Sequence, residues 1–268
     1  MSAKIYDTTS QAFVDAETPK VNSGGVFIDA EGKVYSGGAW EDAWKNMPVP
    51  PVIDGLINDF EFIGNFNDEC GNATAGTLTG TATYGTDQSV GNYVDLPNGV
   101  YWEGASTSYQ FKGNTDFSIS LWQKTYDLSN TVACMITQLG CSSAQNTWLA
   151  GIYEIYNIST TKDSLRGTIM SNPDANIEFI DIQNIIANTW HHLVVTHSPT
   201  SVSFYIDNAL QGTKSLSSNN NGGDAIIFGA LLGAGRVQYG GPMQIAKARI
   251  YNKVLSSSEI SLLYNEAS

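Results

Sequence analysis

Short stretches in which apolar and polar residues alternate recur along most of this 268-residue chain. Over residues 117–124 the sequence reads Phe-Ser-Ile-Ser-Leu-Trp-Gln-Lys, so a strand would carry Phe117, Ile119 and Leu121 on one face. Residues 190–196 read as a mostly buried strand. This pattern predicts short strands, each burying at least one face, over most of residues 52–268.

The signals near the C-terminus extend this pattern. Residues 202–212 predict a hairpin, because Asp207-Asn208 tolerates the positive φ angles of a type I′ turn. Residues 244–251 alternate again and predict another strand.

The chain closes with the one helix that the sequence predicts convincingly. Ser256 and Glu259 have the spacing of a capping box, in which each residue satisfies the backbone N–H of the other. Ile260, Leu263 and Tyr264 then form one apolar stripe. We therefore expect a short terminal helix packed on the strands.

Residues 1–47 contain a short internal repeat. The segments 4–16 and 33–43 each read as strand, polar turn and strand, and 25–35 reads as another hairpin between them. Pieces this short cannot bury their aromatic faces alone. We therefore expect this segment to dock onto sister copies or another protein through Tyr6, Phe13, Tyr35, Trp40 and Trp44.

A proline-rich stretch separates this repeat from the rest of the chain. Three prolines within residues 48–51 favour a semi-rigid, extended spacer. This predicts a docking segment at 1–47, a linker at 48–51 and a β-sandwich domain at 52–268. The alternative is that the stretch lies along the second domain as an edge segment.

Composition and charge support an all-β class and exclude several partners. Charged residues are only 15% of the chain, glycines number 26, and 13 Lys and Arg stand against 26 Asp and Glu, for a net charge of −13. Binding to nucleic acid or to anionic membranes relies on clustered basic residues, so we expect neither. The N-terminal residues lack the apolar stretch of a signal peptide, and no segment is long enough to span a membrane. We expect a chain made in the cytoplasm.

The three cysteines suggest no metal site. Cys70, Cys134 and Cys141 lack the paired spacing of zinc ligands. Cys134 lies in an apolar run, where a thiol usually packs as a small hydrophobic group. A disulfide between Cys134 and Cys141 across a hairpin is the alternative.

Three of these landmarks occur in an order that resembles the concanavalin A-like lectin/glucanase superfamily, in particular its laminin-G-like modules. Residues 117–124, 190–207 and 245–266 match in turn F-S-[IV]-S-x-W, W-x-H-[LV]-x-[VT]-T with Y-[IV]-D-[GN], and the closing strand and helix. The resemblance covers roughly residues 90–268 and departs at 244–247, where relatives often have an acidic residue beside an Ile. It implies an all-β, two-sheet antiparallel jelly-roll sandwich with a short C-terminal helix.

The glucanases of this superfamily carry their catalytic acids as E-x-D-x-E on one strand face. The nearest match here has Glu178 and Asp181 three residues apart, which on a strand puts them on opposite faces, and Gln183 follows. His192 corresponds to a structural histidine of the family. We therefore expect no enzymatic activity.

Sugar binding would use aromatic faces flanked by polar side chains. The candidates lie in stretches rich in turns or polar residues: Trp148, Tyr153, Tyr156 and Tyr239. Each can equally be a core or subunit-interface residue. Asp87, Asp116 and Asp224 could supply oxygens to Ca²⁺, but no loop has the dense acidic spacing of a calcium site, so we predict no cofactor.

The N-terminal repeat is similar to short β repeats of bacteriophage tail, baseplate and head-fibre proteins. This implies a virion structural protein, homo-oligomeric and bound to other virion proteins, whose lectin-like domain mediates adhesion, with host surface glycans as candidate ligands. The alternative is a secreted or surface-displayed microbial carbohydrate-binding module.

Overall fold

The computed structural model describes residues 53–112, 114–124, 188–215, 223–230 and 242–266 with their side chains. It describes the backbone alone for residue 125 and for the strands at 4–7, 12–15, 21–23, 26–28, 33–36, 39–42, 135–139, 150–154, 164–170, 177–183, 231–233 and 236–239. The chain divides into two compact units, Met1–Val52 and Ile53–Ser268. The predicted linker at 48–51 and the predicted cysteine pair at 134 and 141 lie outside the described residues.

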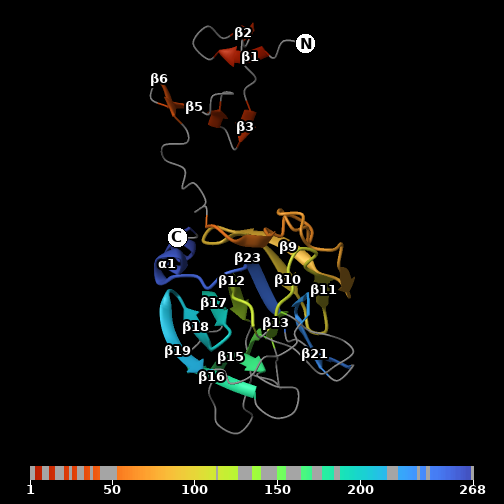
Figure 1. The fold of residues 1–268 in the computed structure, drawn as a ribbon. Coiled ribbons are helices and arrows are strands. Elements are labelled where there is room, and N and C mark those ends of the chain that lie inside the picture. Colours follow the sequence, from red (N-terminus) through yellow and green to blue (C-terminus); the bar gives the residue numbers. More distant parts are fainter. Residues whose placement is uncertain are drawn as a thin grey trace. The chain divides into compact units, whose positions relative to one another are not determined.

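The larger unit is built on two antiparallel sheets that pack face to face (Figure 1). The first sheet has the order β19-β18-β17-β12-β23-β10-β9, with β7 also paired to β23. Its strands are β7 (Leu56–Phe60), β9 (Thr83–Asp87), β10 (Gly91–Leu96), β12 (Phe117–Thr125), β17 (Trp190–Ser198), β18 (Ser201–Ile206), β19 (Ala209–Ser215) and β23 (Met243–Tyr251).

The second sheet has the order β16-β15-β14-β13-β20-β11-β8. Its strands are β8 (Thr77–Thr79), β11 (Tyr101–Ala105), β13 (Met135–Leu139), β14 (Ala150–Glu154), β15 (Ser164–Met170), β16 (Ile177–Gln183) and β20 (Ala225–Phe228). A separate hairpin pairs β21 (Ala230–Gly233) with β22 (Arg236–Tyr239). The predicted two-sheet sandwich is thus confirmed.

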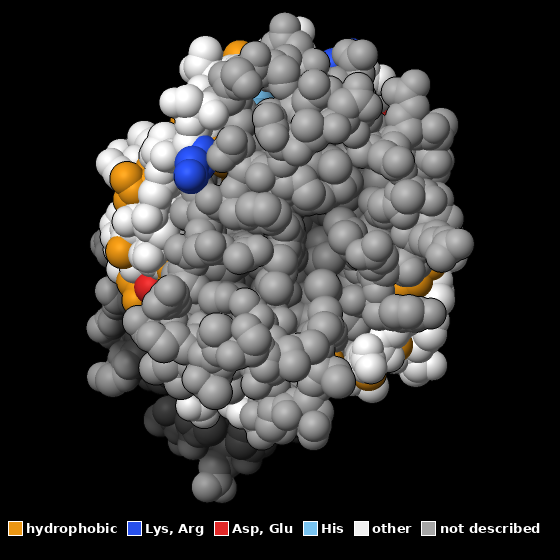
Figure 2. Space-filling view, turned by 90° about the horizontal axis from the view of Figure 1, so that it is seen from below, with side chains coloured by type: hydrophobic (Ala, Val, Ile, Leu, Met, Phe, Trp, Pro, Cys, Tyr) orange, Lys and Arg blue, Asp and Glu red, His pale blue; other side chains and the backbone are white. Residues whose placement is uncertain are grey.

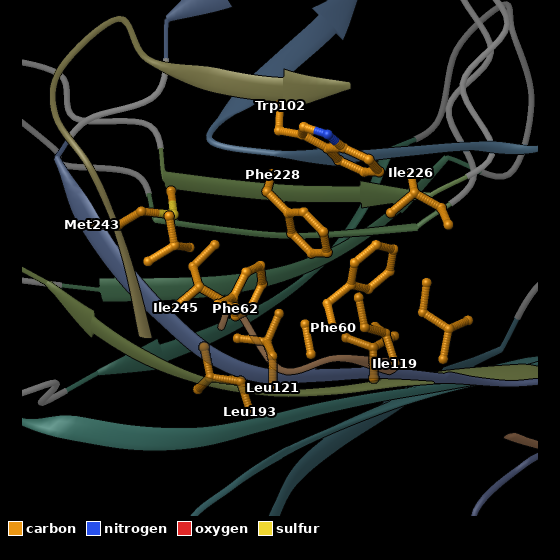
Figure 3. Packing of buried hydrophobic residues seen from close by; sticks show 14 of the residues in the cluster. Phe60, Phe62, Trp102, Ile119, Leu121, Leu193, Ile226, Phe228, Met243 and Ile245 are labelled. Carbon is orange, nitrogen blue, oxygen red and sulfur yellow. The ribbon is translucent and has the colours of Figure 1, made fainter. Parts of the chain in front are cut away.

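The hydrophobic core lies between the two sheets. The predicted face of β12 supplies Phe117, Ile119 and Leu121, each at most 2% exposed. From the second sheet Trp102 and Phe228 point toward them (Figure 3). Burying each side chain of this size stabilises the fold by roughly 1.5–3 kcal/mol, so the core accounts for much of the stability of the sandwich.

The first sheet is also covered on its outer face. Helix α1 (Ser257–Asn265) buries Ile260 and Leu263, and the ring of Tyr264 stacks on Trp122 with centroids 5.7 Å apart. Trp122 and Trp190 therefore lie in a small cluster outside the first sheet, not between the sheets. Because of this cover, every residue of β23 except Lys247 is buried, so the alternation predicted for 244–251 does not expose one face of the strand.

The helix and its preceding hairpin follow the predicted local signals. The Ser256 side chain accepts from the N–H of Glu259, and the Glu259 carboxylate accepts from the N–H of Ser256, which completes the capping box. Asp207 and Asn208 have φ angles of 47° and 65°, as a type I′ turn requires. Among the described residues no helix has the length and apolar character needed to span a membrane.

The N-terminal unit contains two small antiparallel sheets. One pairs β1 with β2, and the other has the order β3-β4-β5-β6. The strands are β1 (Lys4–Asp7), β2 (Ala12–Asp15), β3 (Val21–Ser23), β4 (Val26–Ile28), β5 (Lys33–Ser36) and β6 (Ala39–Asp42). The two copies of the sequence repeat form the hairpins β1–β2 and β5–β6.

Candidate functional site

A hollow of about 270 Å³ lies at the end of β11, where the chain leaves the second sheet. We call it the β11 hollow. Its described lining residues come from three separate segments of the chain: Thr74, Ala105, Ser106, Thr107, Ser108, Tyr109, Gln110 and Asp224. Most of them carry a hydroxyl, amide or carboxylate group, so the hollow is polar in a part of the molecule that adjoins the apolar core.

Hydrogen bonds hold one wall of the hollow to the segment 72–74, which precedes β8. The N–H of Thr74 donates to the carbonyl of Ala105 over 2.8 Å, and the N–H of Ala105 donates to the Thr74 hydroxyl over 2.9 Å. The N–H and the hydroxyl of Thr107 both donate to the carbonyl of Asn72. These bonds continue the edge of the sheet into the loop.

The other wall is fixed next to β20 and to the core. The N–H of Ser106 donates to the carbonyl of Asp224 over 2.7 Å, and the N–H of Phe111 donates to the carbonyl of Gly223 over 2.8 Å. Phe111 is completely buried, and the Tyr109 hydroxyl donates to the carbonyl of Asp116. The loop is therefore held at both ends, and the hollow is preformed.

The side chains of the hollow leave hydrogen-bonding capacity unused. Ser106 is 4% exposed, and its Oγ is buried without a hydrogen-bond partner among the described residues. Among the described residues, no hydrogen bond joins the exposed side chains of Ser108, Gln110 and Asp224 to the protein. These three side chains are therefore open to a polar ligand in the hollow, whereas the Ser106 Oγ is covered by the protein.

The electrostatic character of the hollow is simple. Asp224 is the only ionisable carboxylate among its described lining residues, and none of them is Lys, Arg or His. Figure 2 shows a different aspect of the molecule, a face on which the described atoms include hydrophobic side chains and only isolated charged ones. The hollow can thus donate and accept hydrogen bonds to a polyhydroxylated molecule, with Tyr109 as the one aromatic ring beside it.

A second polar site lies at the end of α1 and, unlike the hollow, consists of charged side chains that pair with one another. We call Asp59, Glu61, Lys247, Arg249 and Glu266 the Arg249 cluster. Arg249 is 7% exposed, and its guanidinium contacts Asp59 at 3.2 Å, Glu61 at 2.8 Å and both oxygens of Glu266. Lys247 lies 3.6 Å from Glu266.

Burial raises the pKa of Asp59 to about 6, the negative charges of Glu61 and Glu266 add to this rise, and Arg249 opposes it. In contrast, the contacts with Arg249 lower the pKa of Glu266 in spite of its burial. The cluster ties β7, β23 and the end of α1 together. Its donors and acceptors are used within the protein, so it serves the fold.

The histidines also serve the fold. His192 is 1% exposed and pairs its Nε2 with the Ser120 hydroxyl at 2.8 Å, as its expected structural role requires. His197 stacks on Phe117 with centroids 4.4 Å apart and donates from Nδ1 to the carbonyl of Thr115. Burial lowers the pKa of both rings to about 4, so both are neutral near pH 7.

The four aromatic residues predicted to bind sugar cannot be related to this hollow. Trp148 and Tyr156 lie outside the described residues, whereas Tyr153 lies in β14 opposite Ile136, and Tyr239 lies in β22 opposite Ala230. Only the backbone of those two strands is described. Sugar binding by these rings stays a prediction.

The predicted calcium oxygens do not come together. Asp87 accepts hydrogen bonds from the N–H and hydroxyl of Ser89, and Asp224 lines the β11 hollow while Asp116 does not. In the described part of the chain, no group of three or more His, Cys, Asp or Glu side chains is placed to hold a metal ion.

The remaining predicted residues are placed by the backbone alone. Glu178 and Asp181 both lie on β16, three residues apart and therefore on opposite faces of the strand. In the N-terminal unit the aromatic residues of each repeat pair across a hairpin. Tyr6 is directly opposite Phe13, and Tyr35 is directly opposite Trp40, while Trp44 lies outside the described residues.

Sequence reasoning missed most of the β11 hollow. Residues 106–110 read Ser-Thr-Ser-Tyr-Gln, a polar run with no periodicity that is typical of a loop. Asp224 lies more than a hundred residues further along the chain. The one available signal was the accumulation of hydroxyl and amide side chains directly after a strand.

The fold is a β-sandwich of two antiparallel sheets, with a polar hollow at the end of β11. Residues 87–261 match the concanavalin A-like lectin/glucanases superfamily, so the chain belongs to this superfamily. This confirms the resemblance seen in the sequence. A comparison with curated protein sequences gives no match.

Several solved structures share the fold at low identity. The binding domain of botulinum neurotoxin DC, in complex with SialylT, aligns with a TM-score of 0.62 and 18% identity over 80% of this chain and 52% of its own. The same domain in complex with rat synaptotagmin II gives 0.62 and 17% over 80% and 52%. The binding domain of serotype G gives 0.58 and 14% over 78% and 50%. The chain spans about half the length of these structures.

Proposed function

We propose that the unit Ile53–Ser268 is a non-catalytic, lectin-like domain that binds a carbohydrate in the β11 hollow. The observation that carries this proposal is the group of exposed polar side chains that line the hollow, those of Ser108, Gln110 and Asp224. Sugar hydroxyls both donate and accept hydrogen bonds, as serine, threonine and glutamine side chains do. A volume of about 270 Å³ is near the lower end of ligand pockets and suits one sugar ring.

The family and the structural neighbours support binding over catalysis. The superfamily includes both lectins and glucanases, so the family alone does not decide between the two. The neighbours are described as binding domains, one in complex with SialylT. Glu178 and Asp181 on opposite faces of β16 cannot flank one glycosidic bond from the same face of the sheet.

We further propose that Met1–Val52 attaches this domain to a bacteriophage particle, where host surface glycans are the ligands. The described strands of Met1–Val52 form a two-stranded and a four-stranded sheet, and isolated hairpins are marginally stable in water. The cross-strand pairs Tyr6–Phe13 and Tyr35–Trp40 recur in both copies of the repeat. A repeated aromatic pair suits contacts with sister copies or with other virion proteins.

A glycan array tests the lectin function. The full chain is expected to bind a defined set of glycans. Gln110→Ala and Ser108→Ala should each weaken binding roughly threefold to tenfold, the value of one hydrogen bond. Gln211→Ala, on the exposed strand β19, is the matched control and should bind as the wild type does. The absence of any glycan binding, or equal binding by all variants, would contradict the proposal.

A truncated protein that begins at Ile53 tests the docking role. It should remain folded and bind glycans, but it should lose self-association and incorporation into particles. If it assembles and incorporates as the full chain does, Met1–Val52 has no docking role. Recovery of the full chain from the culture medium or cell surface of a producing microbe, without particles, would favour the secreted or surface-displayed module instead.

A further inference from the structure

The β11 hollow has a charge pattern that selects among sugars. Its one charged lining residue in the described part of the chain is Asp224, which is exposed. The nearest basic residue along the loop, Lys112, does not line it. We infer that the hollow binds uncharged sugars and rejects those that carry a carboxylate, sulfate or phosphate group. This inference rests on the proposed carbohydrate-binding function.

The described lining of the hollow offers no cation to an anionic sugar. Arg and Lys side chains are the usual partners of anions, and none lines it in the described residues. The backbone N–H groups of Ala105, Ser106 and Thr107 already donate to the Thr74 hydroxyl, to the carbonyl of Asp224 and to the carbonyl of Asn72. An anionic group beside these three residues would therefore meet neither a cation nor a free N–H group.

The Asp224 carboxylate adds direct repulsion. Two like charges about 4 Å apart weaken binding roughly fivefold even at the dielectric constant of bulk water, and more where water is partly excluded. For an uncharged sugar the same carboxylate is favourable, because a carboxylate only accepts hydrogen bonds and neighbouring sugar hydroxyls can donate to it. The group that repels acidic sugars thus orients neutral ones.

The net charge of the chain acts in the same direction at longer range. A net charge of −13 slows the approach of anions, and salt screens this effect over about 10 Å at 0.1 M. Discrimination against acidic sugars should therefore be strongest at low ionic strength. The part that remains at high salt reports the contact with Asp224.

The test is a comparison of matched neutral and acidic glycans on the full chain. Lactose, N-acetyllactosamine, their sialylated and sulfated derivatives, and neutral and uronate-containing oligosaccharides are titrated at 20 and 500 mM NaCl. We expect each neutral glycan that binds to bind at least fivefold more tightly than its acidic derivative at 20 mM NaCl, with a smaller ratio at 500 mM. Preferential binding of the acidic derivatives would overturn the inference and leave the lectin function standing. Binding of no glycan would remove both.

Two variants with equal net charge separate the local contact from the overall field. Asp224→Asn should reduce the neutral-to-acidic ratio by threefold or more. Asp116→Asn changes an exposed residue that does not line the hollow and should leave that ratio near the wild-type value. If both variants shift the ratio equally, or if neither does, Asp224 does not set the selectivity.

Discussion

The β11 hollow and the Arg249 cluster are both polar, but the cluster is buried and paired within the protein, whereas the hollow is open. In the cluster, Arg249 is buried and surrounded by three carboxylates, and its hydrogen-bonding groups are used within the protein. In the hollow, the exposed side chains of Ser108, Gln110 and Asp224 line an open space. The difference is that the charged groups of the cluster neutralise one another, whereas the polar groups of the hollow stay open to solvent and to the carbohydrate that we propose.

The largest expected effect is in the Arg249 cluster. Arg249→Met leaves the carboxylates of Asp59, Glu61 and Glu266 facing one another without their shared cation. Removing one partner of a buried ion pair costs about 3–5 kcal/mol, which for this size lowers the Tm by roughly 10 °C. Thermal unfolding measures this loss.

Lys214→Met, on the exposed strand β19, is the control and should change the free energy of unfolding by less than about 1 kcal/mol. An equal, small effect of both variants would contradict the structural role of the cluster.

The buried titratable side chains should make the free energy of unfolding depend on pH. His192 and His197 have folded pKa values of about 4, below the unfolded value of 6.5, so the unfolded chain takes up protons first as the pH falls. Each ring therefore removes about 3 kcal/mol of stability between pH 6.5 and 4. Asp59 acts in the opposite direction, because its raised pKa of about 6 favours the protonated folded state below pH 6.

The net expectation is a loss of about 3 kcal/mol between pH 7 and 4, measured by urea unfolding at a series of pH values. His192→Gln should flatten this dependence, and Asp59→Asn should steepen it. Stability that stays constant or rises on acidification would show that the histidines are not held in their neutral form.

A pair of serine variants compares a buried hydroxyl that has a hydrogen-bond partner with one that has none. Ser120→Ala removes the partner of His192 and should cost about 1–3 kcal/mol, because a buried ring nitrogen is left unpaired. Ser106→Ala removes a hydroxyl that has no partner to lose, so the free energy of unfolding should stay the same or rise by up to about 1 kcal/mol. Chemical unfolding checks both. A marked loss of stability in Ser106→Ala would mean that this hydroxyl is bonded in the free protein.

The smallest effect is expected at the exposed rim of the hollow. Gln110→Ala and Asp224→Asn should each change the free energy of unfolding by less than about 0.5 kcal/mol, because neither side chain is buried. The same variants should alter glycan binding. A loss of stability that parallels the loss of binding would show that the rim residues belong to the fold.

The sequence predicted the parts of the fold that carry local signals. The alternation over 117–124, the Asp207-Asn208 turn and the capping box at Ser256 each specify one element within a few residues, and the structure has all three. The helix α1 was expected to pack on the strands, but the cover on both faces of β23 was not expected. One face of β23 packs on α1, which follows it directly, and the other packs against the second sheet, whose strands come from distant parts of the chain.

The site could be predicted only in part. Asp224 was singled out as an oxygen donor for Ca²⁺, and it is the one predicted residue that lines the hollow. The loop 106–110 has no periodicity, and its register is set by hydrogen bonds to Asn72 and Asp224. Such long-range backbone pairing leaves no trace in the local sequence. The aromatic candidates were chosen from composition, which does not indicate which strands meet.

The central claim is that a sugar binds in the β11 hollow, and chemical-shift mapping tests it most directly. The backbone amide resonances of the ¹⁵N-labelled full chain are followed while a glycan identified on the array is added. The account predicts that the largest shift changes cluster at residues 105–110 and 224, and that they are reduced in Gln110→Ala. Shift changes that cluster instead around Trp148, Tyr153 and Tyr156, with the hollow unaffected, would contradict it.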